Sequence, residues 1–293
     1  MFRSTKVAAI FDFDKTLSPQ YMQKVIFDAY QVDEDSFWVD CRKRSKENEM
    51  LFGGTHHEVD YMATMLSYVK NGKFLGLTNE KLKSLGETIP LYPGVAWMFN
   101  EIWKTGAEIY IISSGIKTML GTLEGRIQRE INNADFRISG IYGGDFREDE
   151  NGLCSIANCI SAMDKTRFIY EISKGCNIYN FDVTTSVPIG GRRVPLENII
   201  YVGDGPSDVW VWNLIKDSGG YTMGVFNPEF PSQFELVENI RKGNRLDTVA
   251  VADYREGSTA ASWILGKIKE MIKLSSEEYM IKQRVTTIKR PGY

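Results

Sequence analysis

Three short apolar runs lie far apart in the chain, and each ends directly in small or polar residues. They are KVAAIF at 6–11, AEIYII at 107–112 and NIIYV at 198–202, followed by Asp12, by Ser113 and by Gly203-Asp204 respectively. Continuous apolar runs of this length are typical of strands buried on both faces of a parallel sheet. The carboxyl ends of parallel strands meet at one edge, where open α/β sheets place their sites. The pattern therefore predicts that three distant segments meet at one site.

Helices are predicted between these runs. Residues 93–104 carry apolar side chains at helical spacing, whereas residues 18–90 contain helical spacing but no buried-strand run. We expect an α/β fold with a doubly wound parallel sheet core, formed by residues 1–17 and 91–293. A helical cap of residues 18–90 is inserted after the first strand. The last ~40 residues should form a peripheral amphipathic helix and tail.

Composition argues against several classes of protein. The 293-residue chain has a net charge of −3, so no basic field attracts nucleic acid. No apolar run approaches the ~18 residues of a membrane helix, and the N-terminus lacks the pattern of a signal peptide. The four cysteines form no C-x-x-C pair and read as thiols of a reducing compartment, the cytoplasm. With only His56 and His57, a Ser-His-Asp hydrolase is disfavoured.

Two aspartates, Asp12 and Asp14, follow the first apolar run. They point to the same face of an extended strand, and two such carboxylates repel unless a cation or a proton intervenes. An ionised Asp12 can attack phosphorus and form an aspartyl-phosphate, while Asp14 serves as acid and base. Asp204 brings a third carboxylate from another strand end. Oxygen ligands in this number suit Mg²⁺.

A phosphate group also needs hydrogen-bond donors. Ser113 lies where a strand gives way to a helix, so its hydroxyl and nearby backbone N–H groups can hold phosphate oxygens. Lys165 precedes a helical stretch and can supply a fixed positive charge. The strand ends thus offer both acids and donors.

These segments resemble the four motifs of the haloacid dehalogenase superfamily of phosphohydrolases. The first is DFDKTL at 12–17, the second is IISSG at 111–115, the third is Lys165, and the fourth is GDGPSD at 203–208. The motifs occur in the family's order, and the resemblance covers residues 6–17 and 90–230. The insert at 18–90 stands where the phosphoserine-phosphatase-like branch carries a helical cap.

The resemblance implies roles in catalysis and metal binding. Asp12 would be the nucleophile and a magnesium ligand. Asp14 would be the acid/base, with its backbone carbonyl on the metal, and Thr16 would hold the loop geometry. Asp204 would bind Mg²⁺ directly, and Asp208 would bind it or hold a coordinating water. Because dehalogenases lack the second aspartate, Asp14 favours phosphate chemistry.

The resemblance also implies a phosphate-binding set, formed by Ser113, Ser114, Gly115 and Lys165. Gly115 and Gly205 would let the backbone approach the site. Ser114 is an alternative to Ser113. Residues 178–197 read as a loop that lengthens the gap between the third and fourth motifs, so Lys174 is a rival for Lys165.

Several features of the insert have more than one interpretation. His56-His57 suit an exposed turn better than a substrate loop, and the RKRSK run at 42–46 suits a solvated helix face better than an anion site. Phe37, Trp38 and Phe52 suit either a pocket or the packing of the insert. Tyr21 and Met22 follow the first motif closely enough to face a substrate.

The sequence therefore predicts a magnesium-dependent phosphatase acting on a small phosphorylated metabolite through an aspartyl-phosphate on Asp12. A cap that excludes water and large substrates favours a metabolite over a phosphoprotein. A phosphotransferase with the same intermediate, a non-catalytic binding protein of the same fold, and a regulatory phosphatase acting on a protein are the alternatives.

Overall fold

A computed structural model describes residues 6–53 and 57–286, without the side chains of 189 and 278–286. Its centre is a seven-stranded sheet in the order β4-β3-β2-β1-β5-β6-β7. Neighbouring strands are parallel except β3 and β4, which are antiparallel. The strands are β1 (Ala8–Phe11), β2 (Glu108–Ile116), β3 (Gly140–Asp149), β4 (Gly152–Asn158), β5 (Ile199–Gly203), β6 (Tyr221–Phe226) and β7 (Thr248–Val251). The predicted α/β class is confirmed.

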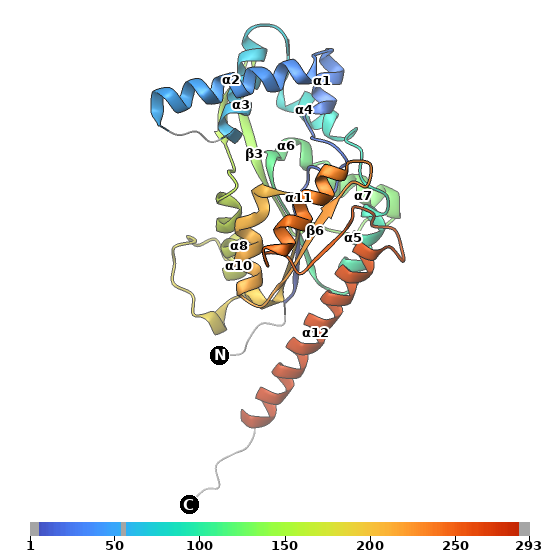
Figure 1. The fold of residues 1–293 in the computed structure, drawn as a ribbon. Helices are drawn as coiled ribbons and strands as arrows, with labels where there is room; N and C mark the ends of the chain where they lie inside the picture. The colour runs from blue at the N-terminus through green and yellow to red at the C-terminus, as the bar shows by residue number, and fades with distance from the viewer. Residues whose placement is uncertain (1–5, 54–56, 287–293) are drawn as a thin grey trace, which may run out of the picture.

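Helices cover both faces of this sheet (Figure 1). Alternate strand residues point to opposite faces, so Ile10 and Tyr201 pack in one buried cluster while Phe11 and Val202 pack in the other. The first cluster is covered by α8 (Asp164–Lys174), α10 (Val209–Asp217) and α11 (Pro231–Lys242). The second is covered by α5 (Val95–Lys104), α7 (Leu123–Ile131) and α12 (Thr259–Thr286). This is the predicted doubly wound arrangement.

The strand register aligns the three carboxyl ends. Phe11 of β1 pairs with both Ile111 of β2 and Val202 of β5, so Asp12, Ser113 and Gly203 lie near the same edge of the sheet. One expectation needs correction, because β2 does not end at residue 112. It runs on to Ile116, with irregular pairing to β3 after Ile112, and Ser113 therefore lies inside the strand as it is assigned.

Four helices lie between β1 and α5, above the site edge of the sheet in Figure 1. They are α1 (Lys24–Tyr30), α2 (Glu34–Phe52), α3 (His57–Lys70) and α4 (Asn79–Gly86). No strand is assigned to residues 18–53 or 57–90. Thr78 caps α4 by accepting the Lys81 backbone N–H at 3.1 Å, as its sequence predicts. The two connections to the sheet lie side by side, because the Tyr92 N–H donates to the Leu17 carbonyl at 2.8 Å.

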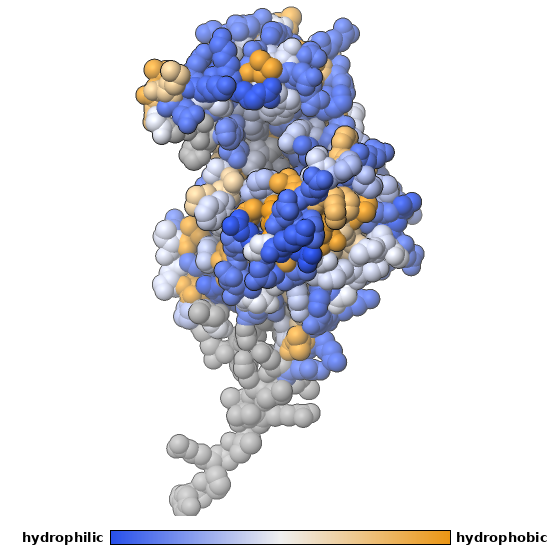
Figure 2. Space-filling view, in the orientation of Figure 1, coloured by the Kyte–Doolittle hydropathy of each residue, from blue (hydrophilic) through white to orange (hydrophobic). Residues whose placement is uncertain are grey.

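The interior of these helices is aromatic. Phe37 packs against Phe27 at 4.7 Å between ring centroids and against Tyr68 at 5.2 Å, and Tyr68 packs against Phe74 at 5.2 Å. Phe37 thus belongs to the packing of the insert. Phe52 belongs to neither a pocket nor a core, because it is exposed with Met50 and Leu51 at the end of α2, where Figure 2 shows hydrophobic colour.

Short helical segments complete the chain: α6 (Lys117–Leu120), α9 (Cys176–Tyr179), and the 3₁₀ turns η1 (Ile189–Gly191), η2 (Leu196–Asn198) and η3 (Pro206–Asp208). All four cysteines are free thiols. Within the described ranges, no helix is both long and apolar enough to cross a membrane. His56 lies outside the described residues.

Candidate active site

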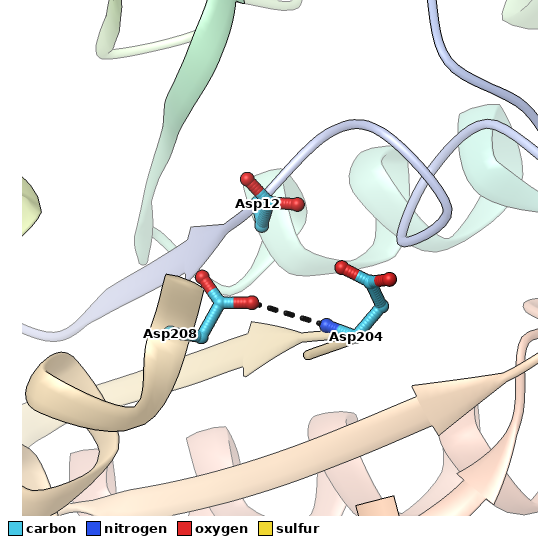
Figure 3. A group of neighbouring side chains, drawn as sticks. All are labelled: Asp12, Asp204 and Asp208. Atoms are coloured by element: carbon cyan, nitrogen blue, oxygen red, sulfur yellow. Dashed lines mark hydrogen bonds between the residues drawn. The ribbon is translucent and has the colours of Figure 1, made fainter. Parts of the chain in front are cut away.

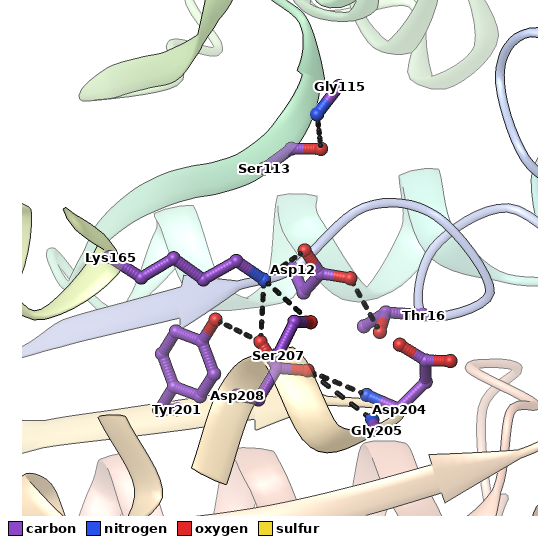
Figure 4. A network of polar contacts seen from close by, with 10 residues as sticks. All are labelled: Asp12, Thr16, Ser113, Gly115, Lys165, Tyr201, Asp204, Gly205, Ser207 and Asp208. Carbon is purple, nitrogen blue, oxygen red and sulfur yellow. Dashed lines mark hydrogen bonds and ion pairs between the residues drawn. The ribbon is translucent and has the colours of Figure 1, made fainter. Parts of the chain in front are cut away.

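A buried lysine joins two of the predicted aspartates. Lys165, at the start of α8, donates from Nζ to Asp12 Oδ1 at 2.8 Å and to Asp208 Oδ1 at 2.7 Å (Figure 4). Its exposed fraction is only 1%. Burial opposes the charged lysine, but the two carboxylates outweigh that effect and raise its pKa above the usual range. A cation at this position holds the Asp12 carboxylate in one orientation.

The rival lysine lies elsewhere. Lys174, at the other end of α8, donates from Nζ to the carbonyl oxygens of Val183 at 2.6 Å and Thr185 at 2.9 Å. It fastens the loop at 178–197. The structure therefore brings Lys165, and not Lys174, to the aspartates.

Asp208 accepts four hydrogen bonds. Its Oδ1 accepts from Lys165 Nζ and from the Tyr201 hydroxyl, both at 2.7 Å. Its Oδ2 accepts from the backbone N–H groups of Asp204 at 3.2 Å and Gly205 at 3.4 Å. A carboxylate offers about four lone-pair sites, so Asp208 is saturated by its neighbours. Asp208 therefore holds both the loop of the fourth motif and the Lys165 side chain in place.

Three carboxylates converge at this edge of the sheet. Asp12, Asp204 and Asp208 each place an oxygen within 4.8 Å of the others (Figure 3). Burial, followed by the negative charges of Asp12 and Asp208, raises the pKa of Asp204 well above its usual value. A divalent cation would relieve this repulsion, and buried oxygen donors of this kind fit Mg²⁺. Asp12 and Asp204 retain the lone pairs for it, whereas those of Asp208 are already used.

Asp14 differs from Asp12 in its surroundings. Burial first, and the charge of Asp12 second, raise the pKa of Asp14 to about 8. Burial also raises the pKa of Asp12, but Lys165 opposes this and the value is about 6. The Met22 backbone N–H donates to Asp14 Oδ1 at 2.8 Å. Near neutral pH, Asp12 therefore favours the ionised form and Asp14 the protonated form.

The irregular end of β2 after Ile112 supplies hydroxyl and amide groups. The Ser113 Oγ accepts the Gly115 backbone N–H at 2.9 Å, and the Ser114 Oγ is buried with no hydrogen-bond partner. The Met22 thioether crosses this segment, where its sulfur accepts the Ile116 N–H at 3.0 Å. A Cβ on Gly115 would meet that thioether, so Met22 would have to move if this position carried a side chain.

The remaining predicted residues support the loops. Thr16 Oγ1 lies 3.4 Å from Asp12 Oδ2, a long contact that leaves this oxygen largely uncommitted. Gly205 contributes its N–H to Asp208. The glycine that close packing requires in this motif is Gly203, where a Cβ would meet the Asp208 carboxylate.

A cavity of about 600 Å³ opens above these groups. The sheet edge forms its floor with Asp12, Asp14, Lys165, Asp204 and Ser113. The helical insert forms its roof, which includes Tyr21, Gln23, Trp38, Cys41, Arg42 and Tyr61. Hydrogen bonds join roof and floor directly, since the Tyr61 hydroxyl donates to the Ser114 carbonyl and the Met22 N–H donates to Asp14 Oδ1, both at 2.8 Å. Residues from both parts of the chain thus line one cavity.

Sequence reasoning missed three contributors to the site. Tyr201 lies within the third apolar run, where it reads only as a strand residue, and Gly203 opens the fourth motif, which gives this glycine no role of its own. Ser207 Oγ lies 3.4 Å from Lys165 Nζ. For Tyr201, the useful signal is a hydroxyl in an otherwise aliphatic buried run, because a buried hydroxyl needs a partner.

Comparisons with known proteins agree with this geometry. No family model matches the chain. An uncharacterized protein of Borreliella burgdorferi is 31% identical over 291 residues, which cover 91% of this chain and 98% of that protein. The two chains belong to one family.

Solved structures give the fold. Cytosolic 5'-nucleotidase IIIB bound to cytidine has a TM-score of 0.54 at 15% identity, covering 93% of this chain and 88% of that one. A substrate-bound phosphoserine phosphatase has a TM-score of 0.50 at 16% identity, covering 83% and 92%. The chain has the fold of these two structures and of a HAD family hydrolase from Salmonella enterica, which has a TM-score of 0.50 at 16% identity. A phosphoserine phosphatase in apo form has the same fold, with a TM-score of 0.51 at 15% identity.

Proposed function

We propose that this chain is a member of the haloacid dehalogenase superfamily, and that it is a Mg²⁺-dependent phosphatase that hydrolyses a small phosphomonoester through an aspartyl-phosphate on Asp12. One observation carries the proposal. The Asp12 carboxylate is fixed by Lys165 at 2.8 Å, on the floor of a cavity that also holds Asp14 and Asp204. A nucleophile, an acid and a charge-stabilising group thus face one space.

Asp12 and Asp14 divide the chemistry between them. An oxygen of ionised Asp12 attacks phosphorus, and the bond from phosphorus to the leaving-group oxygen breaks. Asp14, with its raised pKa of about 8, gives its proton to that oxygen. Asp14 then takes a proton from water, which attacks phosphorus. Breakage of the acyl-phosphate bond releases inorganic phosphate and frees Asp12.

The other residues bind charge. Lys165 and the donors of residues 113–115 would hold the phosphate oxygens. We assign the Mg²⁺ ligands to Asp12, Asp204 and the Asp14 backbone carbonyl, and give Asp208 a positioning role because four donors saturate it. Bound there, Mg²⁺ would offset the repulsion between a carboxylate nucleophile and a phosphate dianion.

We further propose that residues 18–90 form a cap over a core of residues 1–17 and 91–293. The shared cavity supports this assignment, since the insert closes the space above the acids. A cavity roofed by the insert admits a small phosphorylated metabolite more readily than a folded phosphoprotein. The four free thiols favour a reducing compartment such as the cytoplasm.

The test is release of p-nitrophenol from p-nitrophenyl phosphate, with Mg²⁺ or with a chelator. We expect Mg²⁺-dependent turnover that falls by at least about 10³-fold in Asp12→Asn. The exposed Asp217 provides the matched control, and Asp217→Asn should keep full activity. Turnover that survives in Asp12→Asn would contradict the mechanism.

A phosphotransferase and a binding protein give different results. An added acceptor alcohol lowers the ratio of inorganic phosphate to p-nitrophenol if phosphate passes to that alcohol. A non-catalytic protein hydrolyses no ester and does not bind beryllofluoride with Mg²⁺ at Asp12.

A further inference from the structure

The cavity is much larger than a phosphate group requires. Its volume of about 600 Å³ lies inside the range of about 300–1,000 Å³ that is typical of pockets for ligands of many atoms. Phosphate and metal groups occupy only the floor. The space beneath the insert is therefore available to the leaving group, and its walls indicate which leaving group fits.

Tyr21 lies on the leaving-group side of the site. The proposed acid, Asp14, must contact the leaving-group oxygen. The Met22 backbone N–H donates to the Asp14 carboxylate at 2.8 Å, so the preceding residue, Tyr21, stands next to that acid. Tyr21 lines the cavity and is 39% exposed, which leaves part of its ring free for contact.

A second aromatic ring extends this wall. Trp38 of α2 also lines the cavity, and its ring centroid lies 5.6 Å from that of Tyr21. Phe37 packs edge-on against Trp38 at 5.1 Å, and the indole Nε1 donates to Glu34 Oε1 at 3.3 Å. Because these contacts fix the indole, the wall is formed before any ligand arrives.

Lys15 holds the tyrosine from the floor side. Its Nζ lies 3.8 Å from the centre of the Tyr21 ring, a cation–π contact. Its backbone has a left-handed φ of 58°, a conformation that costs energy for a residue with a side chain. A strained residue between Asp14 and Thr16 thus directs a cation onto the ring that faces the leaving group.

We infer that Tyr21 and Trp38 form the specificity wall of the site, and that the preferred substrates are phosphomonoesters whose leaving group carries a planar aromatic ring. Aromatic faces favour flat π systems over saturated rings of similar size. This inference rests on the proposed function, because it assumes that Asp14 marks the leaving-group side.

Benzyl phosphate and cyclohexylmethyl phosphate test the inference. Both are esters of primary alcohols with six-membered rings, and they differ in the flatness of the ring. We expect kcat/KM for benzyl phosphate to be about tenfold higher. Tyr21→Leu and Trp38→Leu should each bring the ratio of the two kcat/KM values, benzyl over cyclohexylmethyl phosphate, close to one. Tyr21→Phe and Trp38→Phe should retain the preference, since they keep an aromatic ring.

Phe52→Leu is the matched control, because Phe52 is an exposed aromatic on the same helix as Trp38 and is absent from the cavity wall. It should change neither rate. Equal rates for the two esters in the native protein would overturn the inference while leaving the proposed phosphatase intact. Equal loss of both rates in the leucine variants would show a structural role only. Absence of hydrolysis for every ester, p-nitrophenyl phosphate included, would instead overturn the proposed function.

Discussion

The floor and the roof of the cavity are built by different means. On the floor, Lys165 and Asp208 are almost fully buried, and each is held by several polar partners. In the roof, the helices are held by aromatic packing around Phe37 and Phe74, and the end of α2 exposes Leu51 to solvent. The floor is a polar network on strand ends, whereas the roof is built around an aromatic cluster and exposes large apolar side chains at the end of α2.

This difference separates the residues expected to carry out the reaction, on the floor, from those expected to select the substrate, in the roof. A network in which every partner is satisfied tolerates little change, because the loss of one partner leaves another charge buried. An aromatic cluster tolerates substitutions of similar volume, so its inner wall can vary without loss of the fold. We therefore expect changes on the floor to remove activity and changes in the roof to alter stability or substrate preference.

The largest effect should follow Lys165→Met. The variant leaves Asp12 and Asp208 without their shared cation, so turnover should fall by at least about 10²-fold. The free energy of unfolding should fall by about 3–5 kcal/mol, since two buried carboxylates lose a partner. Urea unfolding and p-nitrophenyl phosphate turnover measure both.

Lys174→Met is the control for this variant, because Lys174 lies in the same helix but donates its hydrogen bonds to carbonyl oxygens of the loop at 183–185. It should keep normal turnover. If the two variants lose activity equally, the floor is not the tight network described above.

A smaller effect is expected in the roof. Asp60 is buried and accepts from Asn48 Nδ2 and from Ser45 Oγ, both at 2.6 Å, which ties α2 to α3. Asn48→Ala removes one donor and should lower the free energy of unfolding by about 1–3 kcal/mol. Hydrogen exchange should accelerate in α2 and α3, while the Mg²⁺ concentration for half-maximal activity stays unchanged. Glu49→Ala, at the exposed neighbouring position, should change neither the free energy of unfolding nor hydrogen exchange. A shifted Mg²⁺ requirement in Asn48→Ala would show that roof and floor are coupled.

The smallest effect concerns the end of the sheet opposite to the site. Burial would raise the pKa of Glu108, but hydrogen bonds from Arg193 and Tyr110 outweigh it and hold the pKa below its usual value of 4.5. Since the folded pKa is the lower one, this contribution to stability is complete above the unfolded pKa and is lost as the pH falls through the folded pKa.

Glu108→Gln should therefore lower the free energy of unfolding by on the order of 1 kcal/mol at pH 7, with a difference that shrinks below about pH 4.5. Urea unfolding across that range measures it. Glu238→Gln, in an exposed ion pair with Arg241, is the control and should show a much weaker trend. A pH-independent difference would rule out the ionised Glu108 as its source.

The sequence predicts the floor far better than the roof, for physical reasons. Apolar runs that end in acids determine both the strand and its chemistry, so Asp12, Ser113 and Asp204 could be brought together without coordinates. The hydrogen bond from the Tyr201 hydroxyl to Asp208 could not be predicted, since strand periodicity does not tell which hydroxyl meets which carboxylate. The extension of β2 past Ile112 depends on irregular pairing with β3, which no local pattern records.

In the roof, helical spacing predicts the helices but not their mutual orientation. Phe37 and Trp38 are adjacent in sequence, yet one is buried among aromatic rings and the other lines the cavity. Whether each side chain is buried or lines the cavity depends on how α2 packs against α1 and α3. Periodicity within one helix does not contain that information.

The hydrogen bond from the Tyr92 N–H to the Leu17 carbonyl has a consequence for the history of such proteins. The chain leaves the sheet and returns to it at nearly the same point, so the segment between can be lengthened, shortened or exchanged with little strain on the strands. A protein that acquires a new insert here keeps its site residues at the strand ends and obtains a different cavity above them. Chimaeras joined at Leu17 and Tyr92 are thus a direct route to enzymes with altered substrate preference.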